Sequence, residues 1–217
     1  MKIPVVRNIL EVNDRVAEQN RALFDQNRVF VCNLMSSPGA GKTSLLERTI
    51  DHLKDRLRIG VIEGDITSNL DAERIVQKGV QAVQINTDGA CHLDANMVWE
   101  AVSNIDLTSL DLMVIENVGN LVCPAEFKVG EDVKVMILSV TEGDDKPLKY
   151  PLMFQLSQAL IINKIDLLPY VDCDMQKVRE TALKLNPGIT IFEVSCRTGE
   201  GLGTWYDWLQ GKIESRA

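Results

Sequence analysis

One stretch constrains the fold of this chain more than any other, and it reads Ser36-Ser37-Pro38-Gly39-Ala40-Gly41-Lys42-Thr43. An apolar run with the composition of a strand precedes it at residues 29–35, and a helix-like run follows from Thr43. Strand, glycine-rich loop and helix in this order form the context in which a Walker A phosphate-binding loop is recognised. The sequence therefore predicts such a loop rather than a strand–helix corner in which glycines occur by chance.

The residue types in this loop fit the binding of a nucleotide phosphate. The glycines allow successive backbone N–H groups to turn toward a phosphate, and the following helix adds its positive N-terminal end. Lys42 supplies a charge for the β- and γ-phosphates, and the Thr43 hydroxyl can hold Mg²⁺. The pattern asks for glycine at position 36, where this chain has the small residue Ser36. The expected nucleotide contacts are Ser37, Pro38, Gly39, Ala40, Gly41, Lys42, Thr43 and Ser44.

Strand-like and helix-like segments alternate along the rest of the chain. Further strands are expected at residues 58–62, 80–85, 112–115, 133–140, 160–162 and 189–194. Helices are expected at residues 71–78, 94–103, 148–155, 172–185 and 203–213. This alternation predicts an α/β fold of the P-loop NTPase kind, in which helices cover both faces of a mostly parallel β-sheet. No repeat or linker divides the sequence, so residues 1–217 are expected to form a single domain.

An extra N-terminal helix is predicted at about residues 8–26. Ile9, Val12, Val16 and Leu23 recur there at helical spacing, with polar residues between them. Because this segment precedes the first strand, it is an addition to a phosphate-loop core. Packing on the domain is the expected role, and binding of a partner is the alternative.

Composition narrows the classes of partner and location. The 217 residues carry a net charge of −8, which disfavours nucleic acid as a partner because a phosphate backbone requires a basic face. The apolar runs are too short for a membrane-spanning helix, and the N-terminus lacks the apolar core of a secretory signal. The five cysteines are an odd, dispersed set, so reduced thiols in the cytoplasm are expected, with metal ligation open to some of them.

The expected base of the nucleotide is guanine, because Asn163-Lys164-Ile165-Asp166 directly follows a strand. The Asp166 carboxylate can accept hydrogen bonds from guanine N1–H and from the 2-amino group, whereas adenine lacks this pair of donors. Asn163 can brace the loop, and the stem of Lys164 can stack on the base. A turn after the last strand is expected to offer a backbone N–H to guanine O6, and its residues are Ser195, Cys196 and Arg197.

The residues around Mg²⁺ and the attacking water are less regular. Where GTPases usually have Asp-x-x-Gly after a strand, this chain has Glu116-Asn117-Val118-Gly119. Glu116 is expected to hold Mg²⁺ directly or through water, and Gly119 to present its N–H to the γ-phosphate. Asp65 can join the metal shell or orient water, with a helix N-cap as the alternative. Together with Lys42 these are the expected catalytic residues, and slow intrinsic hydrolysis is expected because no catalytic glutamine or arginine finger is identifiable.

A second site is suggested by Cys91, His92 and Cys123. They follow the third and fourth expected strands, which should lie near each other in the sheet, so that their loops can meet. A thiolate–imidazole–thiolate set suits Zn²⁺ or Ni²⁺ and does not choose between them. From spacing alone, metal binding and a pair of ordinary cytosolic cysteines both remain open.

These motifs together resemble the hydrogenase nickel-incorporation GTPases, the HypB family, over nearly the whole chain. The resemblance rests on the phosphate loop, on Asn163-Lys164-Ile165-Asp166 and on four further runs: Asp71-Ala72-Glu73-Arg74, Cys91-His92-Leu93-Asp94-Ala95, Glu116-Asn117-Val118-Gly119-Asn120-Leu121-Val122-Cys123-Pro124 and Thr141-Glu142-Gly143-Asp144-Asp145. The runs at 91–95 and 116–124 are the most distinctive.

The resemblance implies a GTPase of the dimer-forming, signal-recognition-like (SIMIBI) class, which binds GTP, GDP and Mg²⁺. It implies that Cys91, His92 and Cys123 bind Ni²⁺ or Zn²⁺ near or across the interface of a homodimer. It also implies delivery of nickel to the large subunit of a [NiFe] hydrogenase, with a second nickel-accessory protein as partner. Because Glu116 and Cys123 share one loop, the γ-phosphate and the metal are expected to influence each other.

Three rival functions remain. The urease-maturation GTPases are recognised partly by a Cys-Pro-His run, whereas here Cys123-Pro124 precedes Ala125. A regulatory GTPase without metal function would act through protein binding alone. A small-molecule kinase is disfavoured by the guanine motif at residues 163–166.

Overall fold

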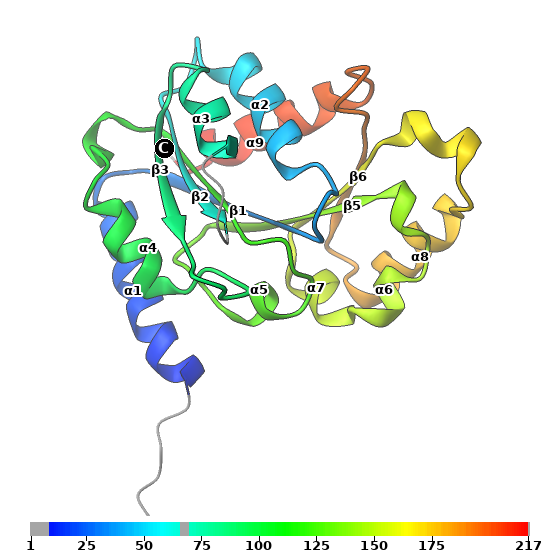
Figure 1. The fold of residues 1–217 in the computed structure, drawn as a ribbon, viewed down its shortest axis with the longest axis horizontal. Helices are drawn as coiled ribbons and strands as arrows, with labels where there is room; N and C mark the ends of the chain where they lie inside the picture. Colours follow the sequence, from blue (N-terminus) through cyan, green and yellow to red (C-terminus); the bar gives the residue numbers. More distant parts are fainter. Residues whose placement is uncertain (1–8, 66–69, 217) are drawn as a thin grey trace, which may run out of the picture.

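The computed structural model describes residues 9–65 and 70–216, in which one layer of parallel strands lies between two layers of helices (Figure 1). The strands form a seven-stranded sheet in the order β3-β2-β4-β1-β5-β6-β7. In sequence they are β1 (Phe30–Ser36), β2 (Ile59–Asp65), β3 (Gln81–Asn86), β4 (Leu112–Glu116), β5 (Val133–Ser139), β6 (Ala159–Asn163) and β7 (Thr190–Glu193).

Helices cover the two faces of this sheet. One face carries α2 (Lys42–Leu53), α3 (Leu70–Val76) and α9 (Leu202–Glu214). The other face carries α1 (Ile9–Gln26), α4 (Ala95–Val102), α5 (Cys123–Glu126), α6 (Lys146–Lys149), α7 (Pro151–Leu156) and α8 (Met175–Leu185). Short 3-10 helices occur at η1 (Leu107–Ser109), η2 (Val140–Glu142) and η3 (Ile165–Tyr170).

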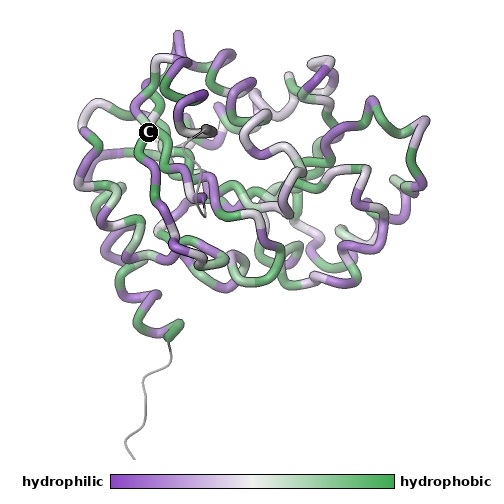
Figure 2. The backbone as a smooth tube through the Cα atoms, in the orientation of Figure 1, coloured by the Kyte–Doolittle hydropathy of each residue, from purple (hydrophilic) through white to green (hydrophobic). Residues whose placement is uncertain are grey.

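The core lies on both sides of the central strands. Every residue of β1 and β5 is buried, as expected for parallel strands covered by helices on both faces. Alternate residues of β1 point to opposite faces, so Cys32 packs with α2 and α9 while Val31 packs with α1 and α4. The tube is hydrophobic along the strands in the middle of the molecule and mixed along the surrounding helices (Figure 2).

The expected parallel α/β fold with an N-terminal helix is confirmed, with two differences in detail. The helix expected at residues 148–155 is two short helices, α6 and α7, because Pro151 has no backbone N–H and disfavours a helical conformation at Tyr150. The third and fourth strands are not neighbours, since β2 lies between β3 and β4. Asn8 and the residues at 66–69 that follow the second strand lie outside the described ranges.

Helix α1 is held by two buried asparagines. Asn13 accepts a hydrogen bond from Ala95 N and donates one to Lys128 O, both at 2.8 Å. Asn20 donates to Ala95 O at 2.8 Å and to Val129 O at 3.0 Å. The helix therefore packs on the domain and joins the segment that begins α4 to the segment that follows α5. Among residues 9–65 and 70–216, no helix is long and apolar enough to cross a membrane.

Candidate functional site

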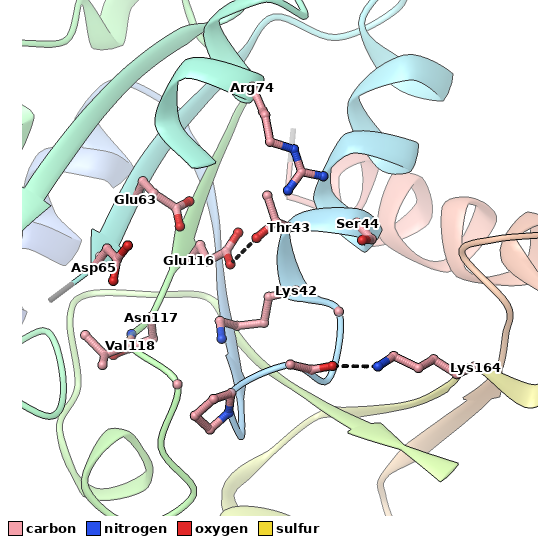
Figure 3. A pocket seen from close by; sticks show the side chains of 15 residues that line it. Lys42, Thr43, Ser44, Glu63, Asp65, Arg74, Glu116, Asn117, Val118 and Lys164 are labelled. Carbon is pink, nitrogen blue, oxygen red and sulfur yellow. Dashed lines mark hydrogen bonds between the residues drawn. The ribbon is translucent and has the colours of Figure 1, made fainter. Parts of the chain in front are cut away.

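A cavity of about 450 Å³ opens where β1, β2 and β4 end at the same edge of the sheet (Figure 3). Ligands of open parallel sheets bind beyond the carboxyl ends of the strands, and this cavity has that position. Its lining comes from the phosphate loop and the start of α2, from the ends of β2 and β4, from the loop after β4, from α3 and from the residue after β6: Pro38, Gly39, Gly41, Lys42, Thr43, Ser44, Glu63, Gly64, Asp65, Arg74, Glu116, Asn117, Val118, Gly119 and Lys164.

The loop between β1 and α2 has the backbone that its glycines predict. Gly39 and Gly41 have φ angles of 76° and 103°, in the left-handed region that favours glycine. A Cβ atom at Gly41 would also collide with the Asn163 side-chain amide. Lys42 Nζ lies 3.1 Å from Ser36 Oγ, so the small residue at position 36 contacts the lysine of the loop. The Ser37 hydroxyl donates to the Glu142 carboxylate.

The expected Mg²⁺ residues converge on one wall of the cavity. Thr43 Oγ1 donates to Glu116 Oε1 at 2.9 Å, and Asp65 at the end of β2 lines the same cavity (Figure 3). A hydroxyl and carboxylates are the oxygen ligands that Mg²⁺ prefers, so this donor set fits the ion. Gly119 lies against Pro38, and a Cβ there would be 3.0 Å from Pro38 Cα. The glycine thus allows the loop after β4 to approach the phosphate loop.

The expected guanine residues form a connected network next to the phosphate loop. Asn163 Nδ2 donates to Ala40 O at 3.0 Å, and Asn163 Oδ1 accepts from Cys196 N at 3.2 Å. Lys164 has a φ angle of 65°, and its Nζ donates to Gly39 O at 2.7 Å. The two segments expected to bind the base are therefore joined to each other and to the phosphate loop through Asn163 and Lys164.

Asp166 and Ser195 are joined as well. Ser195 Oγ donates to Asp166 Oδ1 at 2.6 Å, which orients the carboxylate expected to read the base. Arg48 on α2 braces the same turn, since its guanidinium donates to Cys196 O at 2.9 Å and to Arg197 O at 3.2 Å. The residues expected to contact the nucleotide thus follow strands β1, β6 and β7, at the carboxyl end of the parallel sheet.

Cys91, His92 and Cys123 come together although β2 separates their strands. Their ligand atoms all lie within 4.8 Å of one another, with Cys91 Sγ 3.1 Å from Cys123 Sγ and 3.6 Å from His92 Nδ1. Cys91 is exposed and the other two are half-buried. Cys123 begins α5, and the His92 ring packs on Phe127 with 3.9 Å between centroids. Two thiols and an imidazole at these distances can hold a borderline-soft metal ion such as Ni²⁺ or Zn²⁺.

The surroundings shift the pKa of two of these groups. Burial lowers the pKa of the His92 imidazole, and the Asp94 charge opposes this shift only in part, so the neutral ligand form is favoured. The hydrogen bond with Cys91, followed by burial, raises the pKa of the Cys123 thiol. The other three cysteines, Cys32, Cys173 and Cys196, are free thiols outside this cluster.

One loop connects the cavity with the cluster. It begins at Glu116 in the cavity, passes Gly119 at the phosphate loop, and ends at Cys123. Asn120 Nδ2 donates to Cys91 O at 3.2 Å, so the loop also contacts the chain that carries the other two ligand residues. The two sites are therefore neighbours that share a short covalent segment.

Sequence reasoning missed two charged side chains in the cavity, Glu63 and Arg74. Glu63 on β2 is buried and lies opposite Glu116 in the register of β2 and β4. Its position two residues before Asp65 on the same strand was the available signal, since residues i and i+2 share a face. Arg74 on α3 also lines the cavity, with its guanidinium 2.6 Å from Glu47 on α2.

Known proteins resemble this chain over most of its length. The family described as "CobW/HypB/UreG, nucleotide-binding domain" matches residues 30–193. The hydrogenase maturation factor HypB of Azotobacter vinelandii is 53% identical over 212 residues, which are 98% of this chain and 70% of that protein.

Two solved structures have the same fold at substantial identity. HypB from Helicobacter pylori, crystallised in complex with nickel, has a TM-score of 0.90 and 40% identity over 94% of this chain and 96% of that chain. The hydrogenase maturation factor HypB from Archaeoglobus fulgidus has a TM-score of 0.88 and 39% identity, covering 94% of this chain and 99% of that chain.

Proposed function

Because the chain belongs to the HypB family of hydrogenase maturation factors, within the CobW/HypB/UreG group, we propose that it is a GTP-hydrolysing metallochaperone that delivers nickel during maturation of a [NiFe] hydrogenase. One observation carries the proposal: the loop from Glu116 to Cys123 has one end in the nucleotide cavity and the other in the thiol–imidazole cluster. The proposed nucleotide site and the proposed metal cargo site would therefore share one loop.

In the proposed GTPase reaction, the phosphate loop binds and orients the triphosphate. The α2 N-terminus and Lys42 offset its negative charge, and Gly119 offers its N–H to the γ-phosphate. Thr43, Asp65 and Glu116 would hold Mg²⁺, which neutralises phosphate charge when bound. Asp65 is also the proposed water-orienting residue. Guanine would be selected by the Asp166 carboxylate, which can accept from N1–H and the 2-amino group, and by a backbone N–H of the turn at residues 195–197. The residues of this proposed base site are Asn163, Lys164, Asp166, Ser195, Cys196 and Arg197.

Slow intrinsic hydrolysis is part of the proposal. None of the described residues that line the cavity is a glutamine, and the arginine among them, Arg74, contacts Glu47 at 2.6 Å. A GTPase without a group that stabilises the transition-state charge turns over slowly and suits a switch. We therefore propose that the state of the nucleotide, rather than its turnover, is the output.

The proposed cargo is Ni²⁺, with Zn²⁺ as the competing ion, at Cys91, His92 and Cys123. Mixed thiolate and imidazole ligands suit both ions, and three ligands leave room for transfer to an acceptor. The Helicobacter pylori relative was crystallised with nickel, which favours nickel as cargo. Because Cys91 is exposed at the edge of the cluster, a second chain can reach the ion there.

We further propose that GTP and metal act on a homodimer. A change of the loop at the γ-phosphate would alter Cys123, so GTP and GDP would favour different metal affinities and subunit arrangements. Linkage then requires that metal change GTP affinity or dimerisation by the same factor. The proposed partners are a second nickel-accessory protein and the hydrogenase large subunit, in the cytoplasm.

The test is the mass of the untagged protein in solution with GDP or with a non-hydrolysable GTP analogue, each with and without Ni²⁺ or Zn²⁺. Bound metal is quantified in the same fractions, and Cys123→Ser is the matched variant. The expected result is a nucleotide- or metal-linked dimer whose metal is lost in the variant.

Other outcomes would favour the rivals. A protein that binds GTP but takes up no metal in any state would be a regulatory GTPase without metal function. Metal that stays in Cys123→Ser would contradict the assigned ligands. Transfer of nickel to an apo-urease rather than to a hydrogenase subunit would favour the urease type.

A further inference from the structure

Lys134 is a buried ammonium that lies outside the nucleotide cavity. It sits on β5 with 7% of its surface exposed, and its Nζ donates to Ala125 O at 2.7 Å and to Pro124 O and Phe127 O at 3.1 Å. Glu131 Oε1 lies 3.4 Å away. A lysine has three N–H donors and no acceptor, so its donors match these three carbonyls. All three belong to the segment that follows Cys123.

This segment needs a partner from elsewhere in the chain. Helix α5 has only four residues, Cys123–Glu126. The last carbonyls of any helix receive no hydrogen bond from an N–H of the same helix. A cation near the C-terminal end of a helix binds these carbonyls and matches their partial negative charge. The conformation of the turn that begins with Cys123 therefore depends on a side chain from β5.

Lys134 is also connected to His92, through Phe127. Phe127, whose carbonyl accepts from Lys134, packs its ring on the His92 ring at 3.9 Å between centroids. Lys134 thus holds the turn that carries one metal-ligand residue and the residue that supports another. Burial lowers the pKa of the ammonium and the Glu131 carboxylate opposes that shift, so the charge is kept at a cost in desolvation.

We propose that Lys134 is a positioning residue of the metal site: its ammonium holds Cys123, through the carbonyls of α5, and His92, through Phe127, in the arrangement that binds metal. The inference rests on the proposed function, because it assumes that the cluster is the cargo site. Groups behind the ligands of a metal site typically change metal affinity by about 10–100-fold when they are removed. The same range is expected here.

The test compares Lys134→Met with wild-type protein by titration with Ni²⁺ in the presence of GDP. Methionine keeps the apolar stem and removes the donors, so nickel affinity should fall by about 10–100-fold, while the GTP affinity of the metal-free protein should not change. The matched control is Lys128→Met, in the same segment. The Lys128 side chain is 63% exposed, and its Nζ forms a long ion pair with Asp14 Oδ2 at 3.5 Å.

Two further variants separate positioning from folding. Glu131 is itself buried against Lys134, so Lys134→Met combined with Glu131→Gln removes both charges and leaves neither buried without its partner. Lys134→Arg retains donors and should recover part of the affinity. The spectroscopic readout is the thiolate-to-nickel charge-transfer absorption, which should change in energy or intensity in Lys134→Met and not in Lys128→Met.

Each outcome decides the inference. Unchanged nickel affinity and absorption in a folded Lys134→Met or in the double variant would overturn it and leave the proposed function intact. Equal losses in Lys128→Met and Lys134→Met would also overturn it, since the effect would then be general to the segment. Wild-type protein that takes up no nickel would overturn the proposed metal function and this inference with it.

Discussion

Asn117 accepts a hydrogen bond from the backbone N–H of Leu93, with 3.0 Å between Asn117 Oδ1 and Leu93 N. Asn117 follows Glu116 and lines the cavity that is proposed to bind the nucleotide, whereas Leu93 follows His92. The bond joins the loops after β4 and β3 at the end of the intervening strand β2. This cavity is thereby connected to the His92 side of the cluster as well as to Cys123.

Replacing Asn117 should weaken the linkage between nucleotide and metal. The side chain is fully buried and also donates to Asn33 Oδ1 at 3.3 Å, so Asn117→Ala leaves buried polar groups unsatisfied, which costs about 1–3 kcal/mol of stability. The ratio of nickel affinities with a GTP analogue and with GDP should move toward one. The measurement is nickel titration in both nucleotide states, with exposed Asn104→Ala as control. An unchanged ratio in folded Asn117→Ala would argue against this connection.

Asp166→Asn should change the preferred base. Xanthine carries a carbonyl where guanine carries the 2-amino group, and an asparagine amide can donate to that carbonyl. GTP binding should weaken by about 1–3 kcal/mol, the cost of leaving a buried polar group unsatisfied, while xanthosine triphosphate binding should improve. Competition between the two nucleotides measures this. Ser195→Ala, which removes the 2.6 Å bond to Asp166, is the comparison and should weaken GTP without favouring xanthine.

Glu116→Gln should reduce Mg²⁺-dependent hydrolysis. Thr43 Oγ1 donates to Glu116 Oε1 at 2.9 Å, and a glutamine oxygen can still accept this hydrogen bond. Glutamine lacks the negative charge that would hold the ion. The hydrolysis rate should fall by about tenfold or more, equivalent to about 1.4 kcal/mol of transition-state stabilisation. Rates across a Mg²⁺ titration check this, with exposed Glu126→Gln as control. Wild-type rates at low Mg²⁺ would remove Glu116 from the ion site.

The cysteines should differ in their reaction with iodoacetamide near neutral pH. Alkylation requires the thiolate, and a raised pKa lowers the thiolate fraction. Burial raises the pKa of Cys196 to about 11 and that of Cys32 further, so both should resist until the pH approaches those values. Exposed Cys91 should react first. Nickel should protect Cys91 and Cys123 but not Cys173, as mass spectrometry of modified peptides would show; protection of all three would indicate a general effect.

The sequence by itself determined the class of fold and the nucleotide-binding edge of the sheet. Local patterns carry that information, because a phosphate loop needs its glycines, lysine and threonine at consecutive positions. The same holds for Asn163 to Asp166, since one short loop contains the side chains that are expected to read the base. Apolar periodicity likewise predicted the N-terminal helix and the alternating strands.

Tertiary structure alone decided how distant side chains meet. From the spacing of Cys91, His92 and Cys123 alone, it could not be decided whether they form one site. They lie on loops after strands that are separated by β2, and the folded sheet brings their ligand atoms within 4.8 Å of one another. Lys134 is one lysine among many in the sequence, and its burial against the carbonyls after Cys123 depends on where β5 passes α5. Contacts between residues far apart in the chain follow from packing, which no local pattern specifies.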